Sequence, residues 1–210
     1  MRKLLITTGP QGSGNHLFAR LMSLHTDVVG WEKLKDNYWV PSDEEPFARY
    51  WVHPEELKFP DGDFFCANVS VPFFYDGVRQ VPKIKEVCEK AISLGVKPTV
   101  AIICRDKNIN AVQQKRVGGE VTLPTALSYY KSLIDSDIDY HFIDHEAFFL
   151  YKDYYVWYLG KILKFPVNTK EVNKFITDDP NCKYVSSVDD YWLDSIIREG
   201  RKPFTLRQEE

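Results

Sequence analysis

The chain has 210 residues, of which 44% are hydrophobic, so it can bury a complete core, and its length requires no more than one domain. Its 27 basic and 30 acidic residues give a net charge of −3, which provides no overall positive field for nucleic acid. We therefore expect a single domain over residues 1–210 with no nucleic-acid partner.

The first predicted elements are an apolar strand over residues 3–8, a glycine-rich turn over residues 9–14 and an amphipathic helix over residues 15–24. Glycines let the backbone turn tightly and approach a ligand, and amides at a helix N-terminus favour an anion. The turn predicts a phosphate site, with an ordinary strand-to-helix connection as the alternative. A Walker loop has a lysine where this chain has Asn15, which disfavours simple ATP chemistry.

Three later apolar runs predict further parallel strands that are buried on both faces. They cover residues 63–71, 98–104 and 139–144. Helical patterns alternate with these runs, and they cover residues 83–94, 109–117, 125–135 and 151–163. This alternation predicts an α/β fold, a three-layer α/β/α sandwich around a central parallel sheet.

Two segments fall outside this alternation. Residues 30–60 are rich in aromatic, proline and acidic residues without a sustained period, which predicts a long insertion over the sheet edge. Its aromatic side chains either contact a substrate or simply pack the insertion onto the domain. Residues 205–210 are polar and are expected to form a frayed tail.

Neither a membrane segment nor a metal site is predicted. No stretch approaches the roughly 20 apolar residues that cross a bilayer, and the first apolar run is too short for a signal peptide. The four cysteines lack both CxxC spacing and neighbouring histidines, which argues against zinc. We expect a cytoplasmic protein that uses no metal.

The sequence GPQGSGNHLF, residues 9–18, resembles the 5′-phosphosulfate loop of the PAPS-dependent sulfotransferases. PAPS is 3′-phosphoadenosine 5′-phosphosulfate, and the family has a P-loop NTPase-like α/β fold. Residues 140–168 are similar to the last core strand and long helix of that family, a match that is mostly structural. The resemblance implies that the 5′-phosphosulfate lies against Gly12, Ser13, Gly14, Asn15 and His16.

A second chemically specific match is PTVAIICRDKNINAVQQ, an apolar strand that ends at Arg105 and continues into a helix. It is similar to the segment that holds the 3′-phosphate in this family, with Gln113 where a serine is usual. A guanidinium at the carboxyl end of a parallel strand is well placed to bind two phosphate oxygens. The alternative for Arg105 is a surface salt bridge with Asp106 or Glu120.

The chain departs from the family at groups that matter for catalysis. Sulfuryl transfer needs cations around the transferred group and a base for the acceptor. Gly12 stands in place of the basic loop residue of the family, and Asn68 and Ser70 replace the lysine and histidine of a KTHxP-like pattern. Losing such a group costs about 10²- to 10⁴-fold in rate. A relative that binds PAPS or a nucleotide but is inactive is therefore the alternative.

His16, at the start of the first helix, is the best substitute for the missing groups, and with Ser70 it forms our predicted catalytic pair. The alternative for His16 is a residue that points to solvent or caps the helix. The sequence does not choose a general base among His53, Asp76 and Glu120.

Two other groups are assigned structural roles. His141 and His145 flank the fourth apolar run and are expected not to be catalytic. Arg198, Arg201 and Lys202 are faintly similar to a loop of the family that touches the 3′-phosphate, but a solvated basic turn is the preferred interpretation.

The sequence as a whole predicts a sulfotransferase-like protein that transfers a sulfuryl group from PAPS to a hydroxyl or amine of a small molecule or glycan. We expect this acceptor to lie over the carboxyl ends of the strands, near Ser70, Pro72 and Phe73. A P-loop phosphotransferase ranks last, because the Walker lysine is missing. The oligomeric state is left open.

Overall fold

The computed structural model describes residues 1–30, 41–176 and 180–184. The predicted tail at 205–210, the basic turn at 198–202 and residues 31–40 of the predicted insertion lie outside these ranges.

A five-stranded parallel sheet forms the centre of the fold, with the strand order β2-β3-β1-β6-β7. The strands are β1 (Lys3–Pro10), β2 (Val28–Val29), β3 (Phe64–Val71), β6 (Lys97–Cys104) and β7 (Tyr140–Asp144). Four of them confirm the strands that the apolar runs of the sequence predicted. The fifth, β2, has two residues and is too short to show as a pattern.

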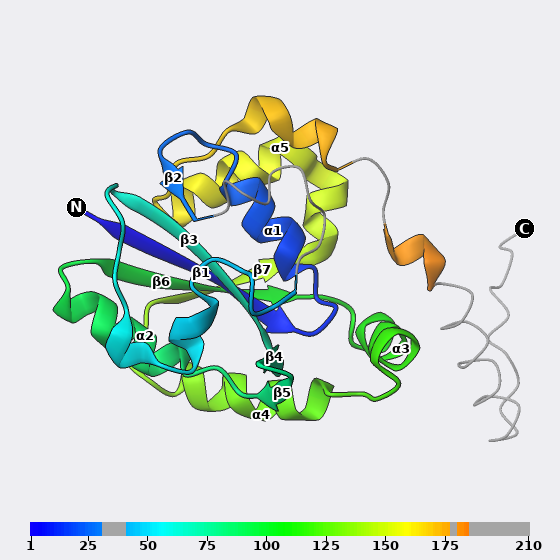
Figure 1. Ribbon diagram of the computed structural model, residues 1–210. Helices are drawn as coiled ribbons and strands as arrows, with labels where there is room; N and C mark the ends of the chain where they lie inside the picture. Colours follow the sequence, from blue (N-terminus) through cyan, green and yellow to red (C-terminus); the bar gives the residue numbers. More distant parts are fainter. Residues whose placement is uncertain (31–40, 177–179, 185–210) are drawn as a thin grey trace, which may run out of the picture.

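Helices cover both faces of this sheet, which confirms the predicted α/β architecture (Figure 1). One face packs against α1 (Asn15–Met22) and α5 (His145–Ile162), and the other against α2 (Ile84–Ser93) and α4 (Leu123–Ile134). Successive side chains of a strand point to opposite faces. Accordingly, Leu5 of β1 belongs to the first core, and its neighbours Leu4 and Ile6 belong to the second.

The helices α3 and α5 begin earlier than their apolar periodicity predicts, because an aspartate caps each of them. Asp144 accepts hydrogen bonds from the amides of Glu146 (2.8 Å) and Ala147 (3.2 Å), so α5 starts directly after β7 rather than at residue 151. Asp106 caps α3 (Lys107–Gly118) in the same way. Lys152, with φ 46°, interrupts α5 and breaks its periodicity where the sequence placed the helix start.

The described part of the insertion packs onto the α2 and α4 side of the sheet. It contains the short 3-10 helices η2 (Ala48–Trp51) and η3 (Pro54–Glu56), and Trp51 is fully buried there. A small antiparallel hairpin, β4 (Phe73–Tyr75) and β5 (Val78–Gln80), follows β3. The chain continues after α5 into η4 (Thr169–Lys174) and η5 (Pro180–Lys183). None of the described helices is long and apolar enough to cross a membrane.

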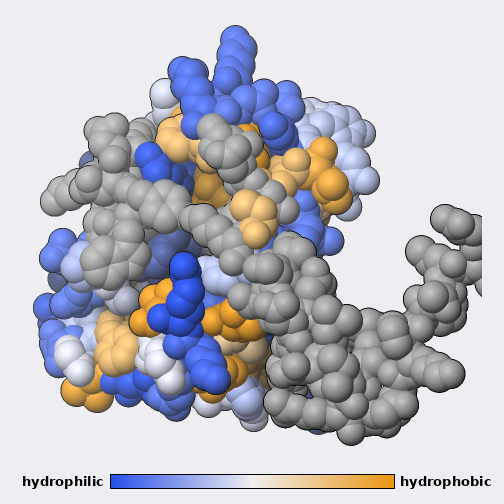
Figure 2. Space-filling model, turned by 90° about the vertical axis from the view of Figure 1, so that its right-hand side faces the viewer, coloured by the Kyte–Doolittle hydropathy of each residue, from blue (hydrophilic) through white to orange (hydrophobic). Residues whose placement is uncertain are grey.

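The connections leave the carboxyl ends of the adjacent strands β1 and β6 in opposite directions. From β1 the chain crosses one face through α1 towards β2, and from β6 it crosses the other face through α4 towards β7. Adjacent strands whose connections leave in opposite directions form a topological switch point, where α/β proteins bind ligands. Figure 2 views the molecule from this side, where a hydrophilic surface is interrupted by hydrophobic patches.

Gly9, at the carboxyl end of β1, is expected to tolerate a side chain poorly. A Cβ atom at Gly9 would lie 3.1 Å from the carbonyl oxygen of Ile103 and would collide with the side chain of Ser13. Gly9→Ala should therefore lower the free energy of unfolding by about 1–3 kcal/mol, measured by urea denaturation. The control is Gly118→Ala, whose new methyl group meets nothing within 4 Å, and it should be neutral or slightly stabilising. Equal effects of the two substitutions would contradict this account.

Candidate functional site

The glycine-rich turn is a tight loop between β1 and α1. The amide of Ser13 donates to the carbonyl oxygen of Pro10 at 2.9 Å, and Gly12 and Gly14 have φ of 81° and 92°. These left-handed conformations favour glycine. Gly14 is the N-cap residue of α1 and makes no side-chain hydrogen bond to the helix. The loop thus presents a helix N-terminus without a side-chain cap, the arrangement that favours anions.

The hydroxyl of Ser13 is the polar group of this loop that the protein leaves unsatisfied. Ser13 is fully buried, and its Oγ has no hydrogen-bond partner among the described residues. A buried polar atom without a partner costs about 1–3 kcal/mol. A ligand oxygen held in the loop would remove this cost, so Ser13 is a fitting residue for an anion site.

Side chains from α3 and from the start of α5 clamp the loop. A Cβ atom at Gly12 would lie 3.0 Å from Cδ of Gln113, and one at Gly14 would lie 2.9 Å from Nε2 of His145. A larger residue at position 12 would therefore have to displace the side chain of Gln113 and adopt a left-handed φ. The His145 ring is buried against Gly14 and is tilted by 45° to the ring of Phe149, so it lies at the loop.

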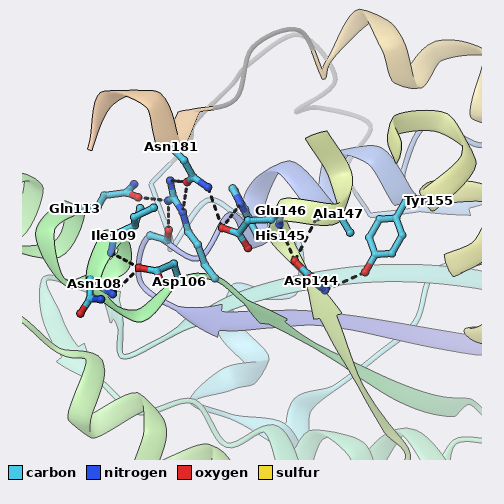
Figure 3. Close-up of polar contacts among 12 residues, drawn as sticks. Asp106, Asn108, Ile109, Gln113, Asp144, His145, Glu146, Ala147, Tyr155 and Asn181 are labelled. Carbon is cyan, nitrogen blue, oxygen red and sulfur yellow. Dashed lines mark hydrogen bonds and ion pairs between the residues drawn. The ribbon is translucent and has the colours of Figure 1, made fainter. Parts of the chain in front are cut away.

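Arg105 joins the end of β6 to the loop. Its Nη1 donates to the carbonyl oxygen of Gly12 at 2.7 Å and also to Oε1 of Gln113. Its Nε and Nη2 both donate to Oδ1 of Asn181 in η5, at 2.9 and 2.5 Å. The structure thus brings together three residues that the sequence predicted for the donor site, Gly12, Arg105 and Gln113. Asn181, which the sequence did not single out, lies between Gln113 and Glu146 (Figure 3).

The two acidic residues considered as salt-bridge partners of Arg105 have other roles. Asp106 accepts hydrogen bonds from the amides of Asn108 and Ile109, both at 2.9 Å. Glu120 pairs with Arg79 at 2.6 Å. The acceptors around Arg105 named above are instead neutral amide and carbonyl oxygens.

A second polar cluster lies on the β3 side of the loop and is centred on Asn68. Its Oδ1 accepts from Asn15 Nδ2 (3.0 Å) and Thr7 Oγ1 (2.9 Å), and its Nδ2 donates to Glu45 Oε2 (2.8 Å). Asn15 Nδ2 also donates to Ser70 Oγ at 3.1 Å. Asn15 and Asn68 are buried, so the residue in place of the Walker lysine and the one in place of the family lysine form a structural network.

Glu45 connects this network to His16. Its Oε1 lies 2.6 Å from Nε2 of His16, and the Glu45 side chain is only 4% exposed, against 30% for His16. A buried carboxylate at this distance fixes the orientation of the imidazole ring. The structure therefore brings the two predicted catalytic residues, His16 and Ser70, to one network, and it adds Glu45. Only an acidic run within an aperiodic insertion marks Glu45 in the sequence.

The other base candidates lie in different surroundings. His53 belongs to an exposed group with Glu55 and Glu56, whose ligand atoms lie within 4.8 Å of one another. Such a group has the donors of a metal site, but Arg49 already binds Glu56, and we assign no ion there. Asp76 lies in the β4–β5 turn with φ 49°.

Two ionisable side chains near the carboxyl ends of β1 and β6 have raised pKa values, which favour their neutral forms at neutral pH. Tyr130 of α4 lies with its hydroxyl 2.8 Å from Thr8 Oγ1, and burial raises its pKa well above 10. Burial also raises the pKa of the Cys104 thiol, which directly precedes Arg105. A thiol with a raised pKa is a poor nucleophile at neutral pH, so covalent catalysis by Cys104 is disfavoured.

Comparison with known proteins does not identify the chain. No model of a known protein family matches the sequence, and no curated protein matches it. Functional inference therefore depends on the geometry of the loop, of Arg105 and of the Asn68 network.

Among the residues of the polar network, Asn68 is expected to contribute most to the free energy of unfolding. Asn68→Leu would remove the Asn68 amide from Oε2 of the buried Glu45 and would take one of two hydrogen-bond partners each from Thr7 Oγ1 and Asn15 Nδ2, so it should lower the free energy of unfolding by about 3 kcal/mol or more. Thr7→Val, which removes one hydrogen bond of Asn68, should cost about 1 kcal/mol. Urea denaturation of both variants measures the difference, and similar losses would show that the network is not centred on Asn68.

Proposed function

We propose that the chain is a sulfotransferase-like protein of the P-loop NTPase-like type, which transfers a sulfuryl group from PAPS to a hydroxyl or amine of a small molecule or glycan. One observation carries this proposal. Gly12 and Arg105, which belong to the two chemically specific matches and are 93 residues apart, are joined by a 2.7 Å hydrogen bond. This contact lies at the switch point between β1 and β6, where a ligand is expected.

The donor site would use the groups around this contact. The 5′-phosphosulfate would bind to the loop amides from Gly12 to His16 and to the Ser13 hydroxyl, which lacks another partner. Arg105 and Gln113 would hold the 3′-phosphate. A phosphate would give Arg105 a charge-assisted hydrogen bond, which is about twice as strong as one to a neutral oxygen.

His16 is our candidate for the proton transfer. PAPS supplies an activated sulfuryl group, and the acceptor oxygen or nitrogen forms a bond to its sulfur while the bond from sulfur to the 5′-phosphate oxygen breaks. The acceptor proton passes to His16, and 3′-phosphoadenosine 5′-phosphate leaves. Glu45 orients His16 across the 2.6 Å contact, and Ser70 offers its hydroxyl to the acceptor. Glu45 is thus a positioning residue.

The second candidate function is a PAPS- or nucleotide-binding protein without transfer activity. It is favoured by Gly12, which stands at the basic position of the family loop, offers no cation there and has the left-handed φ of 81° that favours glycine. A P-loop phosphotransferase is less favoured, because the side chain in place of the Walker lysine, Asn15, is bonded to Asn68 and Ser70.

The donor site is tested by calorimetric titration with 3′-phosphoadenosine 5′-phosphate beside ADP and ATP with Mg²⁺. We expect micromolar binding that is selective for the 3′-phosphorylated ligand. Arg105→Ala should weaken this binding by about tenfold or more, because a charged hydrogen bond is worth about 1.5–3 kcal/mol, while the affinity for adenosine 5′-phosphosulfate stays unchanged. Equal losses for both ligands would remove Arg105 from the 3′ role, and a preference for ATP with Mg²⁺ would refute the proposal.

The transfer step is tested by release of 3′-phosphoadenosine 5′-phosphate from PAPS with a panel of phenols and amino sugars. His16→Ala should lower kcat by about 10²- to 10⁴-fold without loss of donor binding, and Glu45→Gln should have a smaller effect. The matched control is His25→Ala, just beyond the end of α1, which should leave the rate unchanged. Donor binding without turnover in the wild type would instead favour the inactive relative.

A further inference from the structure

The 180–184 segment contacts the guanidinium that the proposed function assigns to the 3′-phosphate. Asn181 Oδ1 accepts hydrogen bonds from both Nε and Nη2 of Arg105, at 2.9 and 2.5 Å. One oxygen thus spans two neighbouring donors of the guanidinium, on the edge with which arginine binds oxyanions. Asn181 is buried, with 6% of its surface exposed, and it comes from a segment 76 residues further along the chain.

The orientation of the Asn181 amide is fixed from its other side. Its Nδ2 donates to Oε1 of Glu146 at 2.9 Å, so the amide nitrogen faces a carboxylate and the amide oxygen faces a cation. Figure 3 shows Asn181 above Glu146 and beside Gln113. The side chain is therefore held in the orientation that presents its oxygen to Arg105.

Tyr184 holds the same segment at a second point. Its ring is buried, and its centroid lies 5.6 Å from Cζ of Arg105 and 5.1 Å from Cζ of Arg116. Its hydroxyl accepts a hydrogen bond from Nη2 of Arg116 at 3.0 Å. Cation–π contacts of this kind become stronger when they are shielded from water. The segment is thus attached to Arg105 through both an amide and an aromatic ring.

We propose that the 180–184 segment is an autoinhibitory latch over the donor site, in which Asn181 occupies the guanidinium edge that a 3′-phosphate must take. This inference rests on the proposed function. A neutral amide oxygen is a weaker partner for a guanidinium than a phosphate, so a 3′-phosphorylated ligand displaces Asn181. A ligand without the 3′-phosphate offers Arg105 no such replacement and leaves the latch closed.

The latch reduces the apparent affinity for the donor. When only a fraction of the molecules is open, the apparent dissociation constant rises by the inverse of that fraction. Removing the Asn181 side chain should therefore tighten donor binding, whereas removing a residue that supports the site would weaken it. The change in donor affinity on removal of the Asn181 side chain therefore distinguishes an inhibitory role from a supporting one.

The experiment is calorimetric titration of 3′-phosphoadenosine 5′-phosphate into the wild type, Asn181→Ala and Asn173→Ala. We expect Asn181→Ala to bind about fivefold more tightly or better, the effect of removing the amide oxygen that competes for Nε and Nη2 of Arg105. Asn173 lies on η4 with an exposed side chain, and its substitution should change nothing. Tighter binding in Asn181→Ala alone supports the latch.

A second readout follows the segment itself through Cys182, the exposed neighbour of Asn181. In a Cys104→Ser background, Cys182 is the only exposed cysteine, because Cys66 and Cys88 are buried. The nucleotide should accelerate the reaction of Cys182 with Ellman's reagent. In the Asn181→Ala variant this reaction should already be fast without nucleotide.

Three results would count against the latch, and they separate it from the proposed function. Weaker binding in Asn181→Ala would show that Asn181 supports the site and would overturn the latch. Binding that is equal in both proteins, with unchanged reactivity of Cys182, would overturn the latch and leave the donor site in place. If neither protein binds the nucleotide, the proposed function fails and the latch fails with it.

Discussion

The guanidinium of Arg105 is the group that holds the loop after β1, the helix α3 and the segment η5 against one another. It lies at the end of β6, and its hydrogen bonds reach the loop after β1 at Gly12, the helix α3 at Gln113 and the distant η5 at Asn181. A guanidinium has five donors in a fixed planar geometry, so one side chain can bond to all three segments at once. Asn110 and Gln114 of α3 bond to the loop independently, through the carbonyl oxygen of Gln11.

The Asn68 network is the counterpart of Arg105 on the other side of the loop. It ties α1 to β3 through Asn15, and it ties the insertion to both through Glu45. Buried amides and a buried carboxylate are stable only when their hydrogen bonds are satisfied, so this cluster positions its members rigidly. His16 is held by Glu45, which in turn accepts a hydrogen bond from Asn68, so Asn68 supports the residue that our proposal makes the base.

The two clusters differ in how far the protein itself satisfies their hydrogen-bonding groups. The Asn68 network is satisfied within the protein, which makes it a structural part of the fold. The hydrogen bonds of Arg105 described above go to neutral oxygens, and the nearby Ser13 hydroxyl has no partner among the described residues. For this reason our proposal assigns the ligand to the β6 side of the loop and the proton transfer to the β3 side.

The sequence by itself determined the parallel sheet, the glycine-rich loop and the place of Arg105, because apolar runs, glycine spacing and a charge at a strand end are local signals. Sequence periodicity could not place the starts of α3 and α5, which depend on capping by Asp106 and Asp144. Only the tertiary structure decided that Glu45 meets His16 and that Asn181 meets Arg105. These pairs are 29 and 76 residues apart, and no local pattern encodes the partner of a side chain whose contact forms when distant segments pack together.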